Sequence, residues 1–84
     1  MNRIKEIIIY TNNRCSYCHK QIEWMKNVGI PFEIKEISHN EMFMKEFISF
    51  GGKGTPFTII KDDNTTEKVL GFNQDKLIKV LGLP

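Results

Sequence analysis

Residues 4–37 read IKEIIIYTNNRCSYCHKQIEWMKNVGIPFEIKEI and carry the strongest structural signal in the chain. The β-branched residues at 4–10 predict a strand that is buried on both faces. The spacing of apolar residues at 15–28 predicts an amphipathic helix, and Gly29 fits the left-handed residue that ends one. Alternating apolar and polar residues at 30–37 predict a second strand. The segment therefore predicts two parallel strands that are joined by a right-handed helical crossover.

The second half of the chain predicts a helix, a β-hairpin and a final helix. Ser38 and Glu41 fit a capping box, with Ser38 as the N-cap of the helix. The expected elements are a helix at 39–50 with Phe43, Phe47 and Phe50 in the core, strands at 57–60 and 66–70, and a helix that begins after Asn73 and ends at Gly82. The element order β-α-β-α-β-β-α predicts an α/β protein with a four-stranded mixed sheet flanked by helices.

Length and composition exclude several classes of protein. The chain has 84 residues, so one domain spanning 1–84 is expected. A formal net charge of +2 gives no indication of nucleic-acid binding. The longest apolar run near the start, Ile-Ile-Ile-Tyr at 7–10, is too short for a membrane span or a secretory signal. We therefore expect a cytoplasmic protein that binds neither nucleic acid nor membranes, and a monomer, because no extended apolar segment is evident.

Cys15 and Cys18 lie at the junction of the first predicted strand and helix. A disulfide that closes so short a loop would barely stabilise the fold, so in a cytosolic chain the pair indicates chemistry. The opening turn of a helix has unpartnered N–H groups that favour an anion, so the Cys15 thiol is expected to be unusually acidic. Arg14 and Lys20 would add positive potential.

Cys18 is expected to be the less exposed of the two cysteines. It follows Cys15 by three residues, on the same helix face, and it belongs to the apolar stripe. This asymmetry suits thiol–disulfide exchange, in which Cys15 attacks a substrate disulfide and Cys18 resolves the mixed disulfide.

Three other interpretations of the cysteine pair remain open at this point. The two cysteines can be ordinary residues that lie close together by chance. The residues Cys-Ser-Tyr-Cys-His at 15–19 match the attachment motif for c-type haem, with Met42 or Met44 as a distal ligand. Zinc could bind to both cysteines together with His19 and His39, although His39 has no paired histidine at the usual spacing.

Thr55 and Pro56 precede the third predicted strand. Proline lacks an N–H group, and only a bond that precedes proline adopts the cis form at low cost. A cis Pro56 beside the cysteines would let the Thr55 main chain pair with an incoming chain. Taken alone, Thr55 and Pro56 are equally well explained as part of a turn.

Four short segments carry a family resemblance. They are Ile-Ile-Ile-Tyr-Thr at 7–11, Cys-Ser-Tyr-Cys at 15–18, Gly-Thr-Pro at 54–56 and Gly-Phe at 71–72. Together they resemble bacterial glutaredoxins and glutaredoxin-like thioredoxins over nearly the whole chain. The resemblance implies the thioredoxin fold and a thiol–disulfide oxidoreductase that serves electron transport and cell redox homeostasis.

The resemblance also implies roles for individual residues. Cys15 corresponds to the nucleophile and Cys18 to the resolving thiol. Pro56 corresponds to the family's cis-proline. The substrate or glutathione groove would be lined by Arg14, Tyr17, Thr55, Pro56, Phe72 and Asn73. No metal or tightly bound cofactor is expected, and glutathione would be a co-substrate.

Departures from the family pattern leave the electron donor open. Ser16 replaces the usual proline, and some relatives without that proline bind an iron–sulfur cluster. Gly71-Phe72-Asn73 replaces the usual glycine pair and acidic residue. Gly-Phe is similar to the proteins that take electrons from thioredoxin reductase and pass them to ribonucleotide reductase, but Val69-Leu70 replaces their aromatic–Ser pair. Glutathione and thioredoxin reductase both remain candidate donors, and disulfide-containing proteins are the expected substrates.

Overall fold

The computed structural model describes residue 4 and residues 6–83. Its elements, in chain order, are β1 (Glu6–Thr11), α1 (Ser16–Val28), β2 (Glu33–Glu36), α2 (Glu41–Ser49), β3 (Phe57–Lys61), β4 (Thr66–Leu70) and α3 (Gln74–Leu81). This is the predicted order β-α-β-α-β-β-α. The expected domain limits, residues 1 and 84, and residue 5 of the expected first strand lie outside the described residues.

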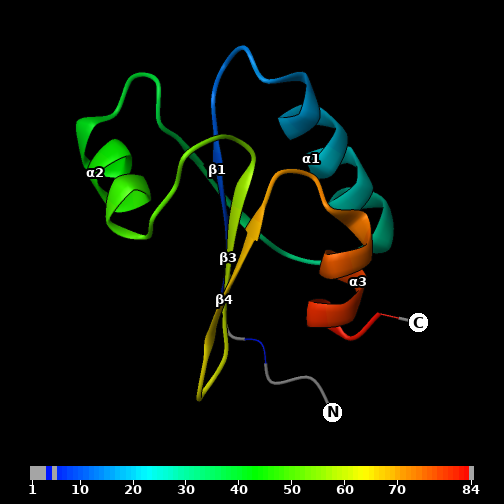
Figure 1. The fold of residues 1–84 in the computed structure, drawn as a ribbon. Helices are drawn as coiled ribbons and strands as arrows, with labels where there is room; N and C mark the ends of the chain where they lie inside the picture. The colour runs from blue at the N-terminus through cyan, green and yellow to red at the C-terminus, as the bar shows by residue number, and fades with distance from the viewer. Residues whose placement is uncertain (1–3, 5, 84) are drawn as a thin grey trace.

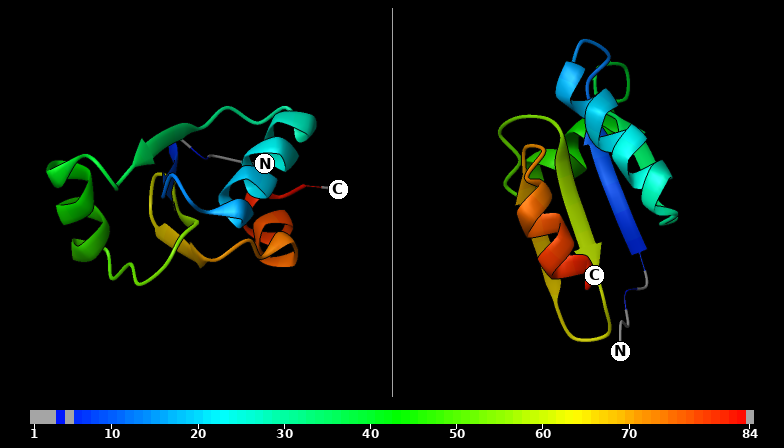
Figure 2. Two further views of the ribbon diagram at one scale, coloured as in Figure 1. Left: turned by 90° about the horizontal axis from the view of Figure 1, so that it is seen from above. Right: turned by 90° about the vertical axis from the view of Figure 1, so that its right-hand side faces the viewer.

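The strands form one mixed sheet in the order β2-β1-β3-β4. β1 and β2 are parallel, whereas β3 is antiparallel to both of its neighbours, β1 and β4. The helices α1 and α3 cover one face of the sheet and α2 covers the other (Figures 1 and 2). The predicted fold class is confirmed, including the parallel pair that α1 connects.

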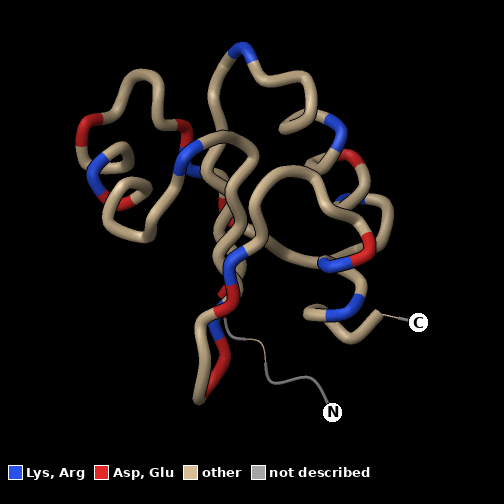
Figure 3. The backbone as a smooth tube through the Cα atoms, viewed as in Figure 1, with Lys and Arg blue, Asp and Glu red and all other residues tan. Residues whose placement is uncertain are grey.

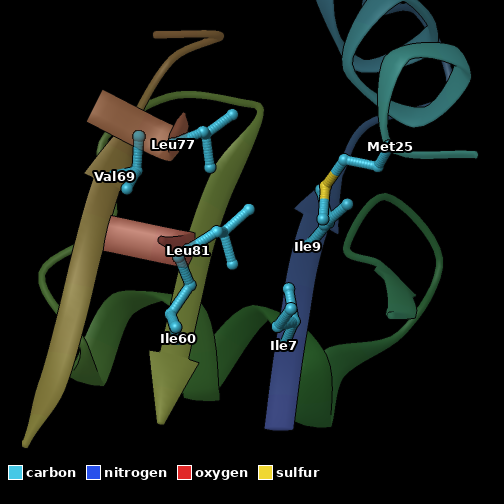
Figure 4. Close-up of a cluster of buried hydrophobic side chains, with 7 residues drawn as sticks. All are labelled: Ile7, Ile9, Met25, Ile60, Val69, Leu77 and Leu81. Carbon is cyan, nitrogen blue, oxygen red and sulfur yellow. The ribbon is translucent and has the colours of Figure 1, made fainter. Parts of the chain in front are cut away.

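Alternation along β1 supplies residues to a core on each face of the sheet. Ile7 and Ile9 point toward α1 and α3, while Ile8 and Tyr10 point toward α2, as a strand buried on both faces requires. Figure 4 shows the first core, which consists of Ile7, Ile9, Met25, Ile60, Val69, Leu77 and Leu81. The second core contains Phe47 and Phe57, with Phe43 and Phe50 packed against it, so the predicted role of the phenylalanines is confirmed.

A polar contact fastens α2 to the sheet. The buried hydroxyl of Tyr10 donates a hydrogen bond to Oε1 of Glu46 at 2.9 Å, and Nζ of Lys35 lies 2.8 Å from the same oxygen. Burial, followed by the hydrogen bond to Glu46, raises the pKa of Tyr10 well above its ordinary value. The contact joins β1, β2 and α2 at one carboxylate.

The predicted start of α2 was wrong. Its N-cap is Asn40, whose side-chain oxygen accepts the Phe43 N–H at 3.0 Å. Ser38 does not cap the helix because its hydroxyl donates to Glu36 at 2.6 Å and accepts the Asn13 N–H at 3.2 Å. The capping box expected at Ser38 is therefore replaced by a contact between the β2–α2 loop and the β1–α1 loop.

Charged residues of both signs are distributed over the helices and over the β3–β4 hairpin (Figure 3). This distribution agrees with the small net charge of +2. Within the described part of the chain, none of the helices combines the length and the apolar character needed to span a membrane.

Candidate redox site

Cys15 is the N-cap residue of α1. Its backbone is extended, with φ −98° and ψ 105°, and its sulfur accepts the Cys18 N–H at 3.1 Å. The Cys15 N–H in turn donates to the Asn12 carbonyl oxygen at 3.1 Å. These contacts place the sulfur at the positive end of the helix, where unpaired N–H groups stabilise an anion.

The surroundings of Cys15 favour its ionised form. Partial burial opposes ionisation, but hydrogen bonds from the side chains of Cys18 and Thr55 and from the main chain of Cys18 and Tyr17 outweigh it. Their net effect is to lower the pKa of the Cys15 thiol below its ordinary value of 9.0. The half-buried sulfur is therefore predisposed to act as a thiolate nucleophile.

Cys18 lies behind Cys15 on the buried face of α1. Only 2% of Cys18 is exposed. Burial, followed by the hydrogen bond to Cys15, raises the pKa of Cys18 to about 11. The two thiols thus differ in exposure and acidity in the direction that the sequence predicts.

Thr55 and Pro56 lie beside the cysteines, and the peptide bond between them is cis. The Thr55 side chain acts to lower the pKa of both thiols, although burial outweighs this effect at Cys18. The Gly71 N–H donates to the Pro56 carbonyl oxygen at 2.8 Å, which brings the β4–α3 turn to the same place. Figure 1 shows the β1–α1 loop, the segment before β3 and this turn at one end of the sheet.

The remaining predicted groove residues have different surroundings. Arg14 is exposed in the β1–α1 loop. Tyr17 is 61% exposed, and Nζ of Lys20 lies 5.1 Å from its ring centre. The structure thus leaves Tyr17 available beside Cys15, as an exposed platform requires.

Phe72 and Asn73 take part in packing and capping. The Phe72 ring lies 6.0 Å from that of Trp24, centre to centre, and both residues pack against the first core. A shallow cleft of about 490 Å³ borders this contact. The Asn73 side chain caps α3 by accepting the Lys76 N–H at 3.1 Å. The structure brings this turn to the site through Gly71, while the Phe72 ring packs against α1 and the Asn73 side chain caps α3.

The haem and zinc arrangements are not assembled by the fold. Met42 and Met44 lie on α2, across the sheet from the cysteine-bearing helix α1. Nε2 of His39 lies 3.3 Å from the Asn13 side chain. Among the described residues, no group of three or more His, Cys, Asp or Glu side chains is close enough to hold a metal ion.

Two residues near the cysteines were not predicted from the sequence. The Asn12 main chain acts to lower the pKa of Cys18 and so opposes the effect of burial. Gln21 is fully buried on α1 between Cys18 and Met25. The spacing from Cys18 would have placed residue 21 on the buried face, but its polar character hid it.

A family model for glutaredoxin matches residues 7–64 of the chain. A search of curated proteins gave no match. Among solved structures, the thioredoxin-like protein BC3987 has 23% identity and a TM-score of 0.81, with 90% of this chain and 100% of that protein covered. At this level of identity, the similarity shows a shared fold and nothing further.

Two further structures are similar to the chain over most of its length. NrdH-redoxin from Escherichia coli has 26% identity and a TM-score of 0.77, with 95% of this chain and 100% of that protein covered. Glutaredoxin from Archaeoglobus fulgidus has 26% identity and a TM-score of 0.72, with coverage of 89% and 84%.

The fold and the cysteine pair define a thiol–disulfide oxidoreductase with the thioredoxin fold. An acidic thiol at a helix start, a buried thiol one turn later and an adjacent cis-proline meet in one place. Because the family model matches more than half of its residues, the chain belongs to the glutaredoxin family.

Proposed function

We propose that the chain reduces protein disulfides or glutathione mixed disulfides in two thiol–disulfide exchanges. In the first, the Cys15 thiolate attacks one sulfur of the substrate disulfide, forms a mixed disulfide and releases the other sulfur as a thiolate. In the second, Cys18 loses its proton and attacks the Cys15 sulfur. The Cys15–Cys18 disulfide forms, the second substrate sulfur leaves, and two electrons have passed from the protein to the substrate.

The observation that carries this proposal is the contrast between the two thiols. The Cys15 sulfur accepts the Cys18 N–H at 3.1 Å and is half-buried, whereas Cys18 is almost fully buried. A substrate sulfur can reach the first thiol, and the second lies one helical turn behind it. This order of access supports Cys15 as the nucleophile and Cys18 as the resolving thiol.

The segment before β3 supports binding of an extended substrate. Thr55 precedes the sheet, and its main chain makes no hydrogen bond with other described residues. A substrate main chain can therefore pair with it next to Cys15, as in strand addition to a sheet edge. Exposed Tyr17 and Arg14 are proposed to flank the same substrate.

A trapping experiment tests the roles of the two cysteines. In Cys18→Ser, substrate is expected to remain disulfide-bonded to Cys15, because the resolving thiol is absent. In the wild-type protein, alkylation at mildly acidic pH is expected to label Cys15 first, since its pKa is the lower one. Faster labelling of Cys18, or failure of Cys18→Ser to trap a substrate, would contradict the assignment.

The electron donor is proposed to be glutathione or thioredoxin reductase. Glutathione would be the donor if it binds as a co-substrate in the groove that the family resemblance implies. The Gly71-Phe72 sequence and the 26% identity to NrdH-redoxin, a glutaredoxin-like protein described as having a thioredoxin-like activity profile, favour the reductase. The second candidate function is therefore electron donation to ribonucleotide reductase. Oxidised protein assayed with each donor separately should be recycled by at least one, and recycling by neither would contradict the proposal.

Iron–sulfur binding is the alternative that Ser16 raises. The chain has two cysteines, and Cys18 is buried, so Cys15 is the thiol that a cluster could reach. Further cluster ligands would have to come from glutathione or a second copy of the chain. For the dithiol reductase, we expect anaerobically purified protein to be colourless, whereas visible absorbance would favour the cluster.

A further inference from the structure

The layer between α1 and the sheet contains one fully buried amide side chain. The buried residues of α1 are Cys18, Gln21 and Met25, which form one stripe against the sheet. Gln21 is 0% exposed, although a long polar side chain is rarely buried without a partner. The stripe thus holds a polar group one helical turn from the proposed resolving thiol.

The hydrogen bonds of Gln21 use only its nitrogen. Nε2 lies 2.6 Å from the hydroxyl oxygen of Thr58, on β3, and 3.8 Å from the sulfur of Met25. Oε1 is buried and has no hydrogen-bond partner among the described residues. Buried polar atoms in native proteins are nearly always paired, so an unpaired buried acceptor requires an explanation.

The position of Gln21 on α1 places a candidate partner next to it. Cys18 precedes Gln21 by three residues, and side chains at this spacing are neighbours on one helix face. Both residues belong to the buried stripe. The Cys18 thiol is therefore the proton donor that lies beside the amide toward the start of α1.

The proposed reaction deprives Cys18 of its present partner. In the reduced protein, the Cys18 thiol donates a hydrogen bond to the Cys15 sulfur, which is the favoured anion. Once Cys15 is joined to a substrate, its sulfur is a neutral disulfide atom and a much weaker acceptor. The buried Cys18 proton then needs another acceptor, and water has little access to it.

We propose that Gln21 is a positioning residue for the resolving step. While Cys15 is bound to substrate, the Gln21 amide oxygen accepts a hydrogen bond from the Cys18 thiol. This inference rests on the proposed roles of Cys15 and Cys18. A hydrogen bond to the neutral thiol holds the proton on Cys18 and delays its attack. The lifetime of the mixed disulfide is therefore set in part by Gln21. When the attack occurs, the proton passes to the departing substrate thiolate.

The S–H stretching band tests the hydrogen bond directly. Cys15→Ala leaves Cys18 as the only thiol and removes its present acceptor. Adding Gln21→Met, which keeps the length of the side chain but removes the amide, is expected to shift the band to higher frequency. Ile9→Val in the same background changes the packing of the first core and should leave the band in place. An unchanged band in Gln21→Met, or an equal shift in Ile9→Val, overturns the inference.

Single-turnover kinetics test the consequence for the reaction. With both cysteines present, Gln21→Met is expected to release the substrate thiol about 2- to 5-fold faster than wild type, the effect of losing one weak hydrogen bond. The rate of Cys15 attack should not change. If Gln21→Met releases substrate at the wild-type rate or more slowly, the inference fails, although substrate trapping by Cys18→Ser still supports the proposed function. If Cys18→Ser traps nothing, the proposed function fails first.

Discussion

Thr55 acts on the reactive sulfur from outside the cysteine motif. Its hydroxyl is one of the hydrogen-bond donors that lower the pKa of Cys15. Thr55→Val keeps the shape of the side chain and removes the donor, so it should raise the pKa of Cys15. Because hydrogen bonds to charged groups contribute about 1.5–3 kcal/mol, alkylation of Cys15 near neutral pH should slow by about 10-fold.

An ultraviolet titration of the Cys15 thiolate measures this change. Thr66→Val is the matched control, because it makes the same substitution at an exposed position on β4. The control should titrate like the wild type. An unchanged titration in Thr55→Val would show that the Thr55 hydroxyl does not stabilise the thiolate.

The sequence predicted the reactive residues better than the residues that surround them. Cys15 and Cys18 were recognisable because their spacing and their place after a strand are specific. Asn12 was treated as loop, since nothing local shows that its main chain would act on the Cys18 thiol. Gln21 was missed because burial of a polar side chain depends on Thr58, which lies 37 positions away in the chain.

The helix starts show where local patterns are sufficient. Asn73 was predicted as the N-cap of α3, and its side chain caps the helix. Before α2, Ser38 and Asn40 both fit as N-caps. The choice depended on two contacts of Ser38. One is local, with Glu36 two residues earlier, and the other, with Asn13, forms only after the two loops have met.

Two substitutions of Asn73 can distinguish its role in stability from a role in substrate binding. Asn73→Ala removes the acceptor for the Lys76 N–H and should lower the free energy of unfolding by about 1 kcal/mol. Asn73→Ser retains a capping oxygen and should be close to wild type in denaturant titrations. If Asn73 also lines the glutathione groove, as the family resemblance implies, both variants should raise the KM for glutathione mixed disulfides. An unchanged KM in Asn73→Ser would show that Asn73 caps α3 and does not bind glutathione.

The order of the elements was predictable because the spacing of apolar residues and the positions of the turn residues agree along the chain. The β-branched run of β1, the glycine after α1 and the turn between β3 and β4 all favour the same topology. Two rules, a right-handed crossover between parallel strands and a tight hairpin, account for the pairs β1–β2 and β3–β4. The antiparallel pairing of β1 with β3, which completes the order β2-β1-β3-β4, does not follow from them. Which residues of different elements touch at the site was not predictable from these rules.

The stability of the whole reduced protein should depend on pH through its two thiols. Cys15 has a lowered pKa, so its contribution to stability is complete above 9.0 and is lost as the pH falls through its native pKa. Cys18 has a pKa raised to about 11 from 9.0, so its contribution is present below 9.0 and is lost as the pH rises toward about 11. Between these two values, the native state holds a proton that the unfolded state has released, and the free energy of unfolding should fall.

Denaturant titrations of the reduced protein at several alkaline pH values can detect this fall. The buried Tyr10 hydroxyl, whose pKa is also raised, contributes a loss of the same sign above its ordinary value of 10.0. The comparison must therefore be made with Cys18→Ala, which keeps Tyr10 and removes only the thiol. A smaller decrease in Cys18→Ala than in wild type is expected. Equal slopes would show that Cys18 does not keep its proton in the folded protein, which removes the difference between the two thiols on which the resolving role depends.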